Sequence, residues 1–295
     1  MMAGYKFATI KRILALKSED FLKSIDDDLL RAEVRKDMII TGGSIAHLIL
    51  GEKVNDYDVY FKSYTTAYNV AKYYVDKFNN LENKPKWLKG IPIVKEEFRD
   101  NIKGETEKRI IIFIKSNGVA GEKEDEDEID IEAGIPIKHK SKYTPIFLSD
   151  NAITLSDKMQ IIIRFCGSPE EIHKNFDFVH CTGYFDVYNH ELHVSKEAMQ
   201  SLLAKNLIYN GSLYPITSVF RLRKFIDRGW NISAGQILKI LFQISKIDLS
   251  DTKILKEQLV GVDTAFMFAL IKELEKVEGQ VEETHLAELI DKIFE

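Results

Sequence analysis

The chain has 295 residues and a mass of 33.9 kDa, which is enough for one large domain or two modest ones. It carries 41 lysines and arginines against 46 aspartates and glutamates, a formal net charge of -5, and 45% of its residues are hydrophobic. These values exclude a disordered or collagen-like chain, and no apolar run approaches the ~20 residues that cross a bilayer. No long apolar segment of a secretory signal opens the chain, so we expect a cytoplasmic protein without membrane contact.

Strands and helices alternate over the first half of the chain. A helix that Ser18 caps is expected to run to about Arg35, with an apolar stripe along one face. The elements expected after it are a strand at 38–40, a helix at 45–50, a strand at 56–61, a helix at 66–78, strands at 108–115 and 128–135, and a helix at 154–165. This alternation favours a sheet covered by helices.

The second half becomes helical after a last mixed stretch. Ser168 and Glu171 have the spacing of a capping box, and 176–187 has the composition of a strand. Helical periodicity then recurs at 197–205, 216–227, 234–244, 252–260 and 265–277. We therefore expect an α+β domain with a mixed sheet and helices over residues 1–195, followed by an all-helical domain over 196–295.

A phosphate-binding turn is predicted just after the first strand. Gly42, Gly43 and Ser44 follow that strand and open a short helix. Two glycines there let backbone N–H groups approach a phosphate, and the helix N-terminus favours negative charge. The serine hydroxyl can donate a hydrogen bond to the same anion.

Two aspartates lie on the next predicted strand. Asp56 and Asp58 are two positions apart, so their carboxylates point to one face of the strand. Paired carboxylates repel unless a cation lies between them, and Mg²⁺ prefers carboxylate and phosphate oxygens. Two such ions would activate an attacking oxygen and stabilise a leaving pyrophosphate, so we expect a two-metal Mg²⁺ site that uses an NTP.

The glycine turn and the aspartate pair together resemble the head motif of the polymerase-β-like nucleotidyltransferase superfamily. More narrowly, they are similar to bacterial poly(A) polymerase and class II CCA-adding tRNA nucleotidyltransferase. That motif runs Gly-Gly, a short helix, Leu-Leu-Gly and Asp-x-Asp, and the spacing here matches without a gap. The resemblance covers roughly 38–232 and implies a nucleotidyltransferase-type head with a helical neck. It also implies that the Gly-Gly-Ser turn holds the triphosphate and that Asp56 and Asp58 bind the metals.

A third carboxylate is part of what the resemblance implies. In the family it usually lies on a neighbouring strand, inside an apolar–acidic–apolar triplet. The triplet at 129–131 fits that description. Asp130 is therefore expected as a metal ligand or as the base for the incoming hydroxyl, and Glu128 and Glu132, on the same strand face, are the fallback candidates.

Two arginines of the predicted neck are candidates for nucleotide binding. Arg221 and Arg223 belong to a cationic cluster that could hold the triphosphate or an RNA backbone, or form a solvated face. The chain also departs from the family. It has Ala46-His47 where the family usually has Arg-Asp, and its tail has no Glu-Asp-x-x-Arg segment, which reads the incoming base in the CCA-adding class.

The activity that the resemblance implies is transfer of a nucleoside monophosphate from an NTP to a hydroxyl, with release of pyrophosphate. An RNA 3′ end, of tRNA or another RNA, is the acceptor that the family implies. The departures keep two alternatives open. One is transfer to a protein or a small molecule, as in toxin-type members of the superfamily, and the other is a non-catalytic module that binds nucleotide or RNA.

Overall fold

A computed structural model describes residues 4–82, 90–100, 106–116 and 142–249, together with the single positions 254, 258, 284, 287 and 288. The chain divides into two compact units. The first consists of Met1–His173 with His180–Leu202, and the second of Lys174–Val179 with Leu203–Glu295. The division between head and tail expected at residue 195 stays a prediction.

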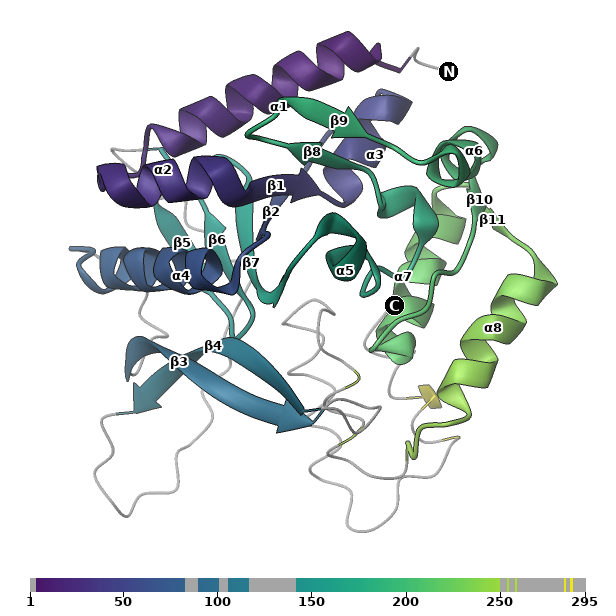
Figure 1. Cartoon of the computed structure of the whole chain (residues 1–295). Coiled ribbons are helices and arrows are strands. Elements are labelled where there is room, and N and C mark those ends of the chain that lie inside the picture. Colours follow the sequence, from purple (N-terminus) through teal and green to yellow (C-terminus); the bar gives the residue numbers. More distant parts are fainter. Residues whose placement is uncertain are drawn as a thin grey trace. The chain divides into compact units, whose positions relative to one another are not determined.

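A seven-stranded mixed sheet forms the centre of the first unit, in the order β5-β6-β7-β2-β1-β8-β9. Its strands are β1 (Met38–Thr41), β2 (Tyr57–Phe61), β5 (Pro145–Leu148), β6 (Ala152–Leu155), β7 (Met159–Cys166), β8 (Tyr184–Asp186) and β9 (Glu191–His193). β2 runs parallel to β7, and the other neighbouring pairs are antiparallel. The predicted α+β fold with a mixed sheet and helices is therefore confirmed (Figure 1).

Among the described residues of the first unit, the helices that precede β8 along the chain are α1 (Phe7–Leu22), α2 (Asp28–Asp37), α3 (Gly43–Leu50), α4 (Tyr64–Asn79) and α5 (Pro169–His173). A separate two-stranded antiparallel ribbon is formed by β3 (Gly90–Asp100) and β4 (Thr106–Ser116). α6 (Lys196–Ala204) follows the last strand of the sheet. Among the described residues, no helix is both long and apolar enough to span a membrane.

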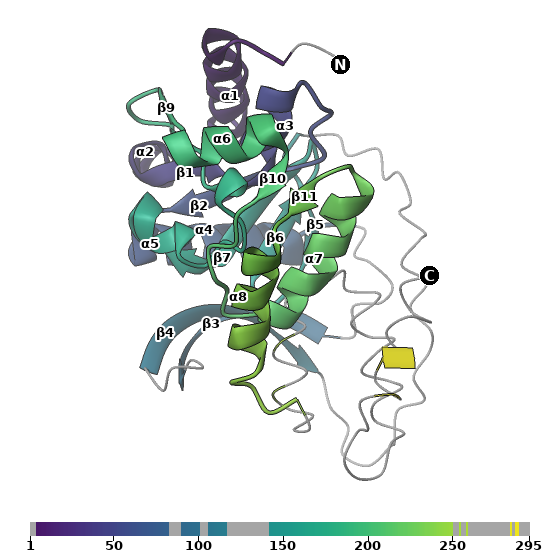
Figure 2. The ribbon, with the colours of Figure 1, turned by 90° about the vertical axis from the view of Figure 1, so that its right-hand side faces the viewer.

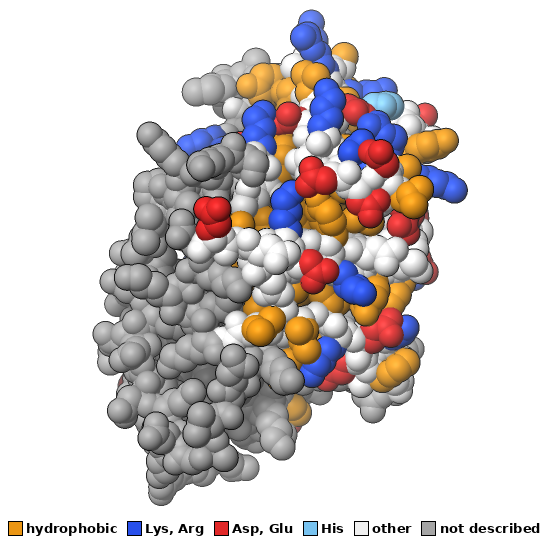
Figure 3. Space-filling model, turned by 90° about the vertical axis from the view of Figure 1, so that its left-hand side faces the viewer, with side chains coloured by type: hydrophobic (Ala, Val, Ile, Leu, Met, Phe, Trp, Pro, Cys, Tyr) orange, Lys and Arg blue, Asp and Glu red, His pale blue; other side chains and the backbone are white. Residues whose placement is uncertain are grey.

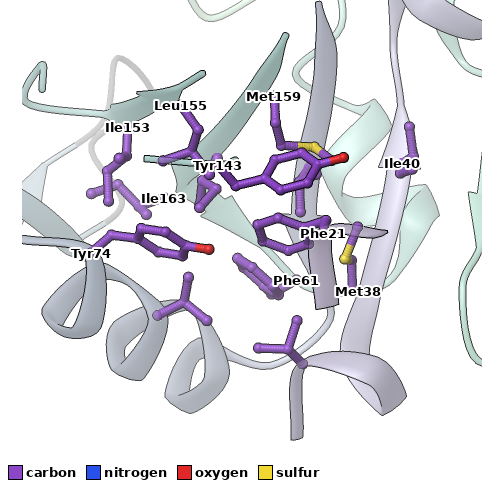
Figure 4. Packing of buried hydrophobic residues seen from close by; sticks show 14 of the residues in the cluster. Phe21, Met38, Ile40, Phe61, Tyr74, Tyr143, Ile153, Leu155, Met159 and Ile163 are labelled. Carbon is purple, nitrogen blue, oxygen red and sulfur yellow. The ribbon is translucent and has the colours of Figure 1, made fainter. Parts of the chain in front are cut away.

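The main hydrophobic core lies between one face of the sheet and helices α1, α2 and α4. Val59 of β2 and its partner Ile40 of β1 are fully buried there. Figure 4 shows core side chains of the sheet strands gathered with Phe21 of α1 and Tyr74 of α4, whose rings stack at 6.2 Å. Because successive residues of a strand point to opposite faces, Asp58, next to Val59, lies on the face away from this core.

The second unit contains α7 (Pro215–Asp227) and α8 (Ala234–Ile244), which lie side by side in Figure 2. The predicted helices at 216–227 and 234–244 are thus confirmed. The short strands β10 (Asn206–Leu207) and β11 (Asn231–Ile232) add a parallel pair that the all-helical expectation for the tail did not include. The helices expected at 252–260 and 265–277 lie outside the continuously described residues.

The helix predicted at 154–165 was wrong, because this segment forms β6 and β7. The apolar run of β7 has no polar alternation, since the strand is central in the sheet, and such a run resembles a helix core. Asp157 and Lys158 both have a positive φ, of 60° and 59°, as in the tight turns that join antiparallel strands.

Two further boundaries differ from the prediction. Ser18 does not cap a helix: it lies inside α1, where its hydroxyl donates to the Leu14 carbonyl at 2.7 Å. The cap belongs to Asp27, whose carboxylate accepts from the first turn of α2. The strand expected at 176–187 is confined to β8, because a short 3₁₀ turn, Val179–Cys181, precedes it.

Candidate active site

The predicted phosphate-binding turn joins β1 to α3. Gly42 is the N-terminal cap of α3 and has φ +91° and ψ −154°, a backbone conformation that is essentially restricted to glycine. The short helix ends as predicted at Gly51, which has φ +71°. The first N–H groups of α3 have no carbonyl partner within the helix, and with the helix dipole they favour an anion.

Asp58 lies beside this turn in the middle of the sheet. Its partner on β1 is Thr41, the residue before the glycine turn. A Cβ atom on Gly42 would lie 3.0 Å from Oδ2 of Asp58. The predicted turn and the second predicted aspartate therefore meet, and the missing side chain of Gly42 makes the approach possible.

Asp56 is exposed and lies one residue before β2. The Tyr57 backbone N–H donates to the carbonyl of Lys158 at 2.9 Å, which pairs the start of β2 with the start of β7. Strand alternation places Asp56 on the same side as Asp58. The two predicted aspartates thus lie on one side of the strand, and their role as metal ligands stays a prediction.

Ser44 lies in the first turn of α3, and only 2% of it is exposed. Within the described part of the chain, its hydroxyl has no hydrogen-bond partner. A buried hydroxyl without a partner is unfavourable by roughly 1–3 kcal/mol. A bound anion would satisfy it, and the phosphate role expected for Ser44 stays a prediction.

Thr41 was not expected from the sequence as a site residue, and neither was His173. The Thr41 hydroxyl donates its proton to the carbonyl of Gly183 at 2.7 Å. Nε2 of His173 lies 2.8 Å from Oγ1 of Thr41, and because the hydroxyl proton is already used, Nε2 must be the donor to Oγ1. Burial lowers the pKa of His173 to about 4, against the opposing effect of Glu170. A neutral imidazole therefore ties α5 to the end of β1, directly before the glycine turn.

The other predicted site residues are distributed differently. Asp130 lies outside the described residues, and its role stays a prediction. Arg221 and Arg223 are both on α7, in the second unit. Nη1 of Arg221 is 2.5 Å from Oδ2 of Asp177. The side chain of Asp177 is 4% exposed, and Arg221 and Arg223 are both exposed. Their contact with a nucleotide stays a prediction as well.

A cavity of about 570 Å³ lies on the face of β2 opposite to the one that carries Asp56 and Asp58. Tyr57, between the two aspartates, lines it together with Lys17 and Tyr143. The Lys17 ammonium lies over both rings, 5.3 Å and 4.9 Å from their centres, and burial lowers its pKa. The aspartates of the candidate site do not line this cavity, so it is separate from the glycine turn.

A divalent cation fits the donors of the site. Asp56 and Asp58 offer carboxylate oxygens, and Mg²⁺ is commonly held by one or two carboxylates together with substrate phosphates. Among the described residues, no group of three His, Cys, Asp or Glu side chains gathers in a way that could hold a metal. The two-metal Mg²⁺ site expected from the sequence, including the part of Asp130 in it, stays a prediction.

The fold and the site define a mixed α+β protein in which a glycine turn meets a carboxylate-bearing strand. The chain belongs to the Gabija anti-defense 2 family, whose sequence profile matches residues 12–205, more than half of its length. A curated relative, Gabija anti-defense 2 of Bacillus phage SPbetaL7, is 22% identical over 271 residues. The alignment covers 91% of this chain and 51% of the relative, so the chain spans about half the relative's length.

Solved structures of CCA-adding enzymes are similar to this chain. The Thermotoga maritima enzyme complexed with tRNA_CCA is 14% identical, with a TM-score of 0.36, covering 94% of this chain and 54% of that one. A CCA-adding enzyme with CTP is 14% identical, with a TM-score of 0.39, covering 91% of this chain and 57% of that one. The Bacillus stearothermophilus enzyme with CTP is 12% identical, with a TM-score of 0.37, covering 85% of this chain and 51% of that one. At such TM-scores the likeness has no bearing on the chemistry of the site. Closeness to bacterial poly(A) polymerase stays a prediction.

Proposed function

We propose that this protein is a nucleotidyltransferase that depends on a divalent cation and moves a nucleoside monophosphate from an NTP to a hydroxyl group. The observation that carries the proposal is the contact between the glycine turn and Asp58. A triphosphate at the N-terminus of α3 would face the carboxylates of Asp56 and Asp58, and like charges repel. A cation between them removes that repulsion, so the arrangement suits a nucleotide bound together with a metal.

The reaction follows from these groups. The acceptor oxygen forms a bond to the α-phosphorus, the α–β bridging P–O bond breaks, and pyrophosphate leaves with the electron pair. The acceptor proton passes to a carboxylate, for which Asp130 is the proposed base. N–H groups of α3 and the Ser44 hydroxyl would hold the phosphates, and Arg221 and Arg223 are proposed nucleotide contacts. The bound Mg²⁺ supplies Lewis-acid stabilisation of the charge on the transferring phosphate.

An RNA 3′ end is the first acceptor to test, because the sequence motif resembles that of RNA-extending enzymes. The surface charge of the face in Figure 3 does not add support for an RNA acceptor. In Figure 3, basic and acidic side chains of the described residues are interspersed, whereas a phosphate backbone prefers a continuous basic surface.

Transfer to a protein is the second candidate, and the family name favours it. The matched relative is named for action against a defence called Gabija. We propose that the activity of this chain also serves counter-defence, and a defence component is then a candidate acceptor. A small-molecule acceptor, or a non-catalytic module that binds nucleotide or RNA, is the remaining alternative.

The test is a transfer assay with each of the four α-labelled NTPs, Mg²⁺, total RNA and a whole-cell protein extract. Asp58→Asn removes the charge at nearly constant shape, and Asp76→Asn, at an exposed position on α4, is the matched control. Label that enters RNA supports the first candidate, and label that enters protein supports the second. If Asp58→Asn and the wild-type chain give equal label in both pools, the proposed activity is wrong.

A second experiment addresses counter-defence directly. Phage plaque formation is counted on cells that carry the Gabija defence and express the wild-type chain or Asp58→Asn. Restored plaques with the wild type alone link counter-defence to the carboxylate. Equal restoration by both would favour the non-catalytic module.

A further inference from the structure

The strands on both sides of Asp58 carry neutral side chains at its level. Asp58 pairs with Thr41 on β1 and with Gln160 on β7. Residues paired across neighbouring strands point to the same face, with Cβ atoms roughly 5 Å apart. Thr41, Asp58 and Gln160 therefore form a row across the face that carries the candidate site.

The two neighbours of Asp58 differ in what they can still bind. The Thr41 hydroxyl is fully buried and already exchanges hydrogen bonds with Gly183 and His173. Gln160 is half-buried, and within the described part of the chain its amide makes no hydrogen bond. In this row, Gln160 alone combines partial exposure with an uncommitted polar group beside Asp58.

We propose that Gln160 is a ligand of the divalent cation held by Asp56 and Asp58, through its amide oxygen. This inference rests on the proposed function. Amide carbonyl oxygens join carboxylates around hard cations.

A neutral third ligand has a measurable consequence. Two carboxylates and one amide carry a total charge of −2. Gln160→Glu adds one negative charge, so the total charge of the ligands becomes −3. A cation a few ångströms away gains attraction from the added charge, and we expect the affinity to rise about tenfold. Gln160→Ala removes the amide oxygen without adding charge, and we expect the affinity to fall about threefold to tenfold.

The experiment is a titration of the full chain with Mn²⁺ alone, without nucleotide, in which unbound Mn²⁺ is measured by electron paramagnetic resonance. Gln200→Glu, at an exposed position on α6, adds the same charge away from the row and is the matched control. Circular dichroism melting of each variant verifies folding. Gln160→Ala provides an independent test should Gln160→Glu fail to fold.

The outcomes separate this inference from the proposed function. Tighter binding by Gln160→Glu than by Gln200→Glu, with weaker binding by Gln160→Ala, supports the amide ligand. If Asp58→Asn weakens Mn²⁺ binding and the Gln160 variants match the wild type, the inference is overturned and the aspartate site stands. If Asp58→Asn leaves binding unchanged, or if the wild type binds no Mn²⁺, the proposed cation site is also overturned.

Discussion

Oδ2 of Asp58 lies 3.0 Å from the position that a Cβ atom on Gly42 would occupy. Gly42→Ala therefore places a methyl group against the carboxylate and also forces an alanine into a glycine-only backbone region, at about 1–3 kcal/mol. We expect lower stability together with loss of nucleotide transfer. Gly211 has φ +104°, and a Cβ atom added there would have no atom of the described residues within 4 Å. Gly211→Ala should thus lower stability without affecting transfer, as measured by urea unfolding and the label assay.

The hydrogen bond from His173 to Thr41 leads to a prediction about pH. Burial lowers the pKa of His173 from 6.5 to about 4, so in this range the unfolded chain binds the proton more readily than the folded chain. The stability that comes with burying the neutral His173 imidazole is present above pH 6.5, and it is lost as the pH falls toward 4. Its slope is at most about 1.4 kcal/mol per pH unit. His180, whose pKa burial lowers to about 3, adds a change of the same sign.

Denaturant unfolding at several pH values tests this prediction. His173→Gln removes the titrating group and keeps an N–H donor, so it should reduce the loss of stability between pH 6.5 and 4. Thr41→Val removes the hydroxyl but leaves the imidazole buried, so it should lower stability and retain the slope. Identical slopes for the wild type and His173→Gln would contradict the assignment.

Ser44 distinguishes a ligand-binding hydroxyl from a structural one. Since its buried hydroxyl has no partner among the residues that the structure describes, Ser44→Ala should leave the free energy of unfolding unchanged or raise it by up to about 1 kcal/mol. The same change should weaken NTP binding about threefold to tenfold, because a phosphate contact is lost. Ser18→Ala removes a satisfied buried hydroxyl, so it should lower stability by about 0.5–1.5 kcal/mol and leave NTP affinity unchanged. Unaltered NTP affinity in Ser44→Ala would exclude the phosphate role.

In the second unit, the ion pair of Arg221 and Asp177 supports a prediction about stability. Arg221→Ala leaves a buried carboxylate without its cation and should lower the free energy of unfolding by about 1.5–3 kcal/mol. Arg223 is exposed and lies two residues further along α7. Arg223→Ala should change the free energy of unfolding by less than about 0.5 kcal/mol. Urea unfolding of both variants gives the comparison. Equal small effects would mean that the ion pair contributes little.

Several elements could be predicted from local sequence because local interactions form them. The capping box is an example: Ser168 Oγ accepts from the Glu171 N–H at 3.3 Å, and the Glu171 carboxylate accepts from the Ser168 N–H at 2.7 Å. The C-terminal end of α3 and both ends of α8 are further examples. Local signals failed at 154–165, where the apolar run of a central strand has the composition of a buried helix.

The sequence by itself determined the glycine turn, the two aspartates after it and the short helix between them, because backbone freedom and residue spacing act over a few positions. Only the tertiary structure decided what surrounds Asp58. Thr41, His173 and Gln160 are far from one another along the chain, and strand register together with the hydrogen bond to Thr41 brings them to one end of the sheet. Register depends on how whole strands pack against the core, and a shift by one residue would turn each side chain to the other face.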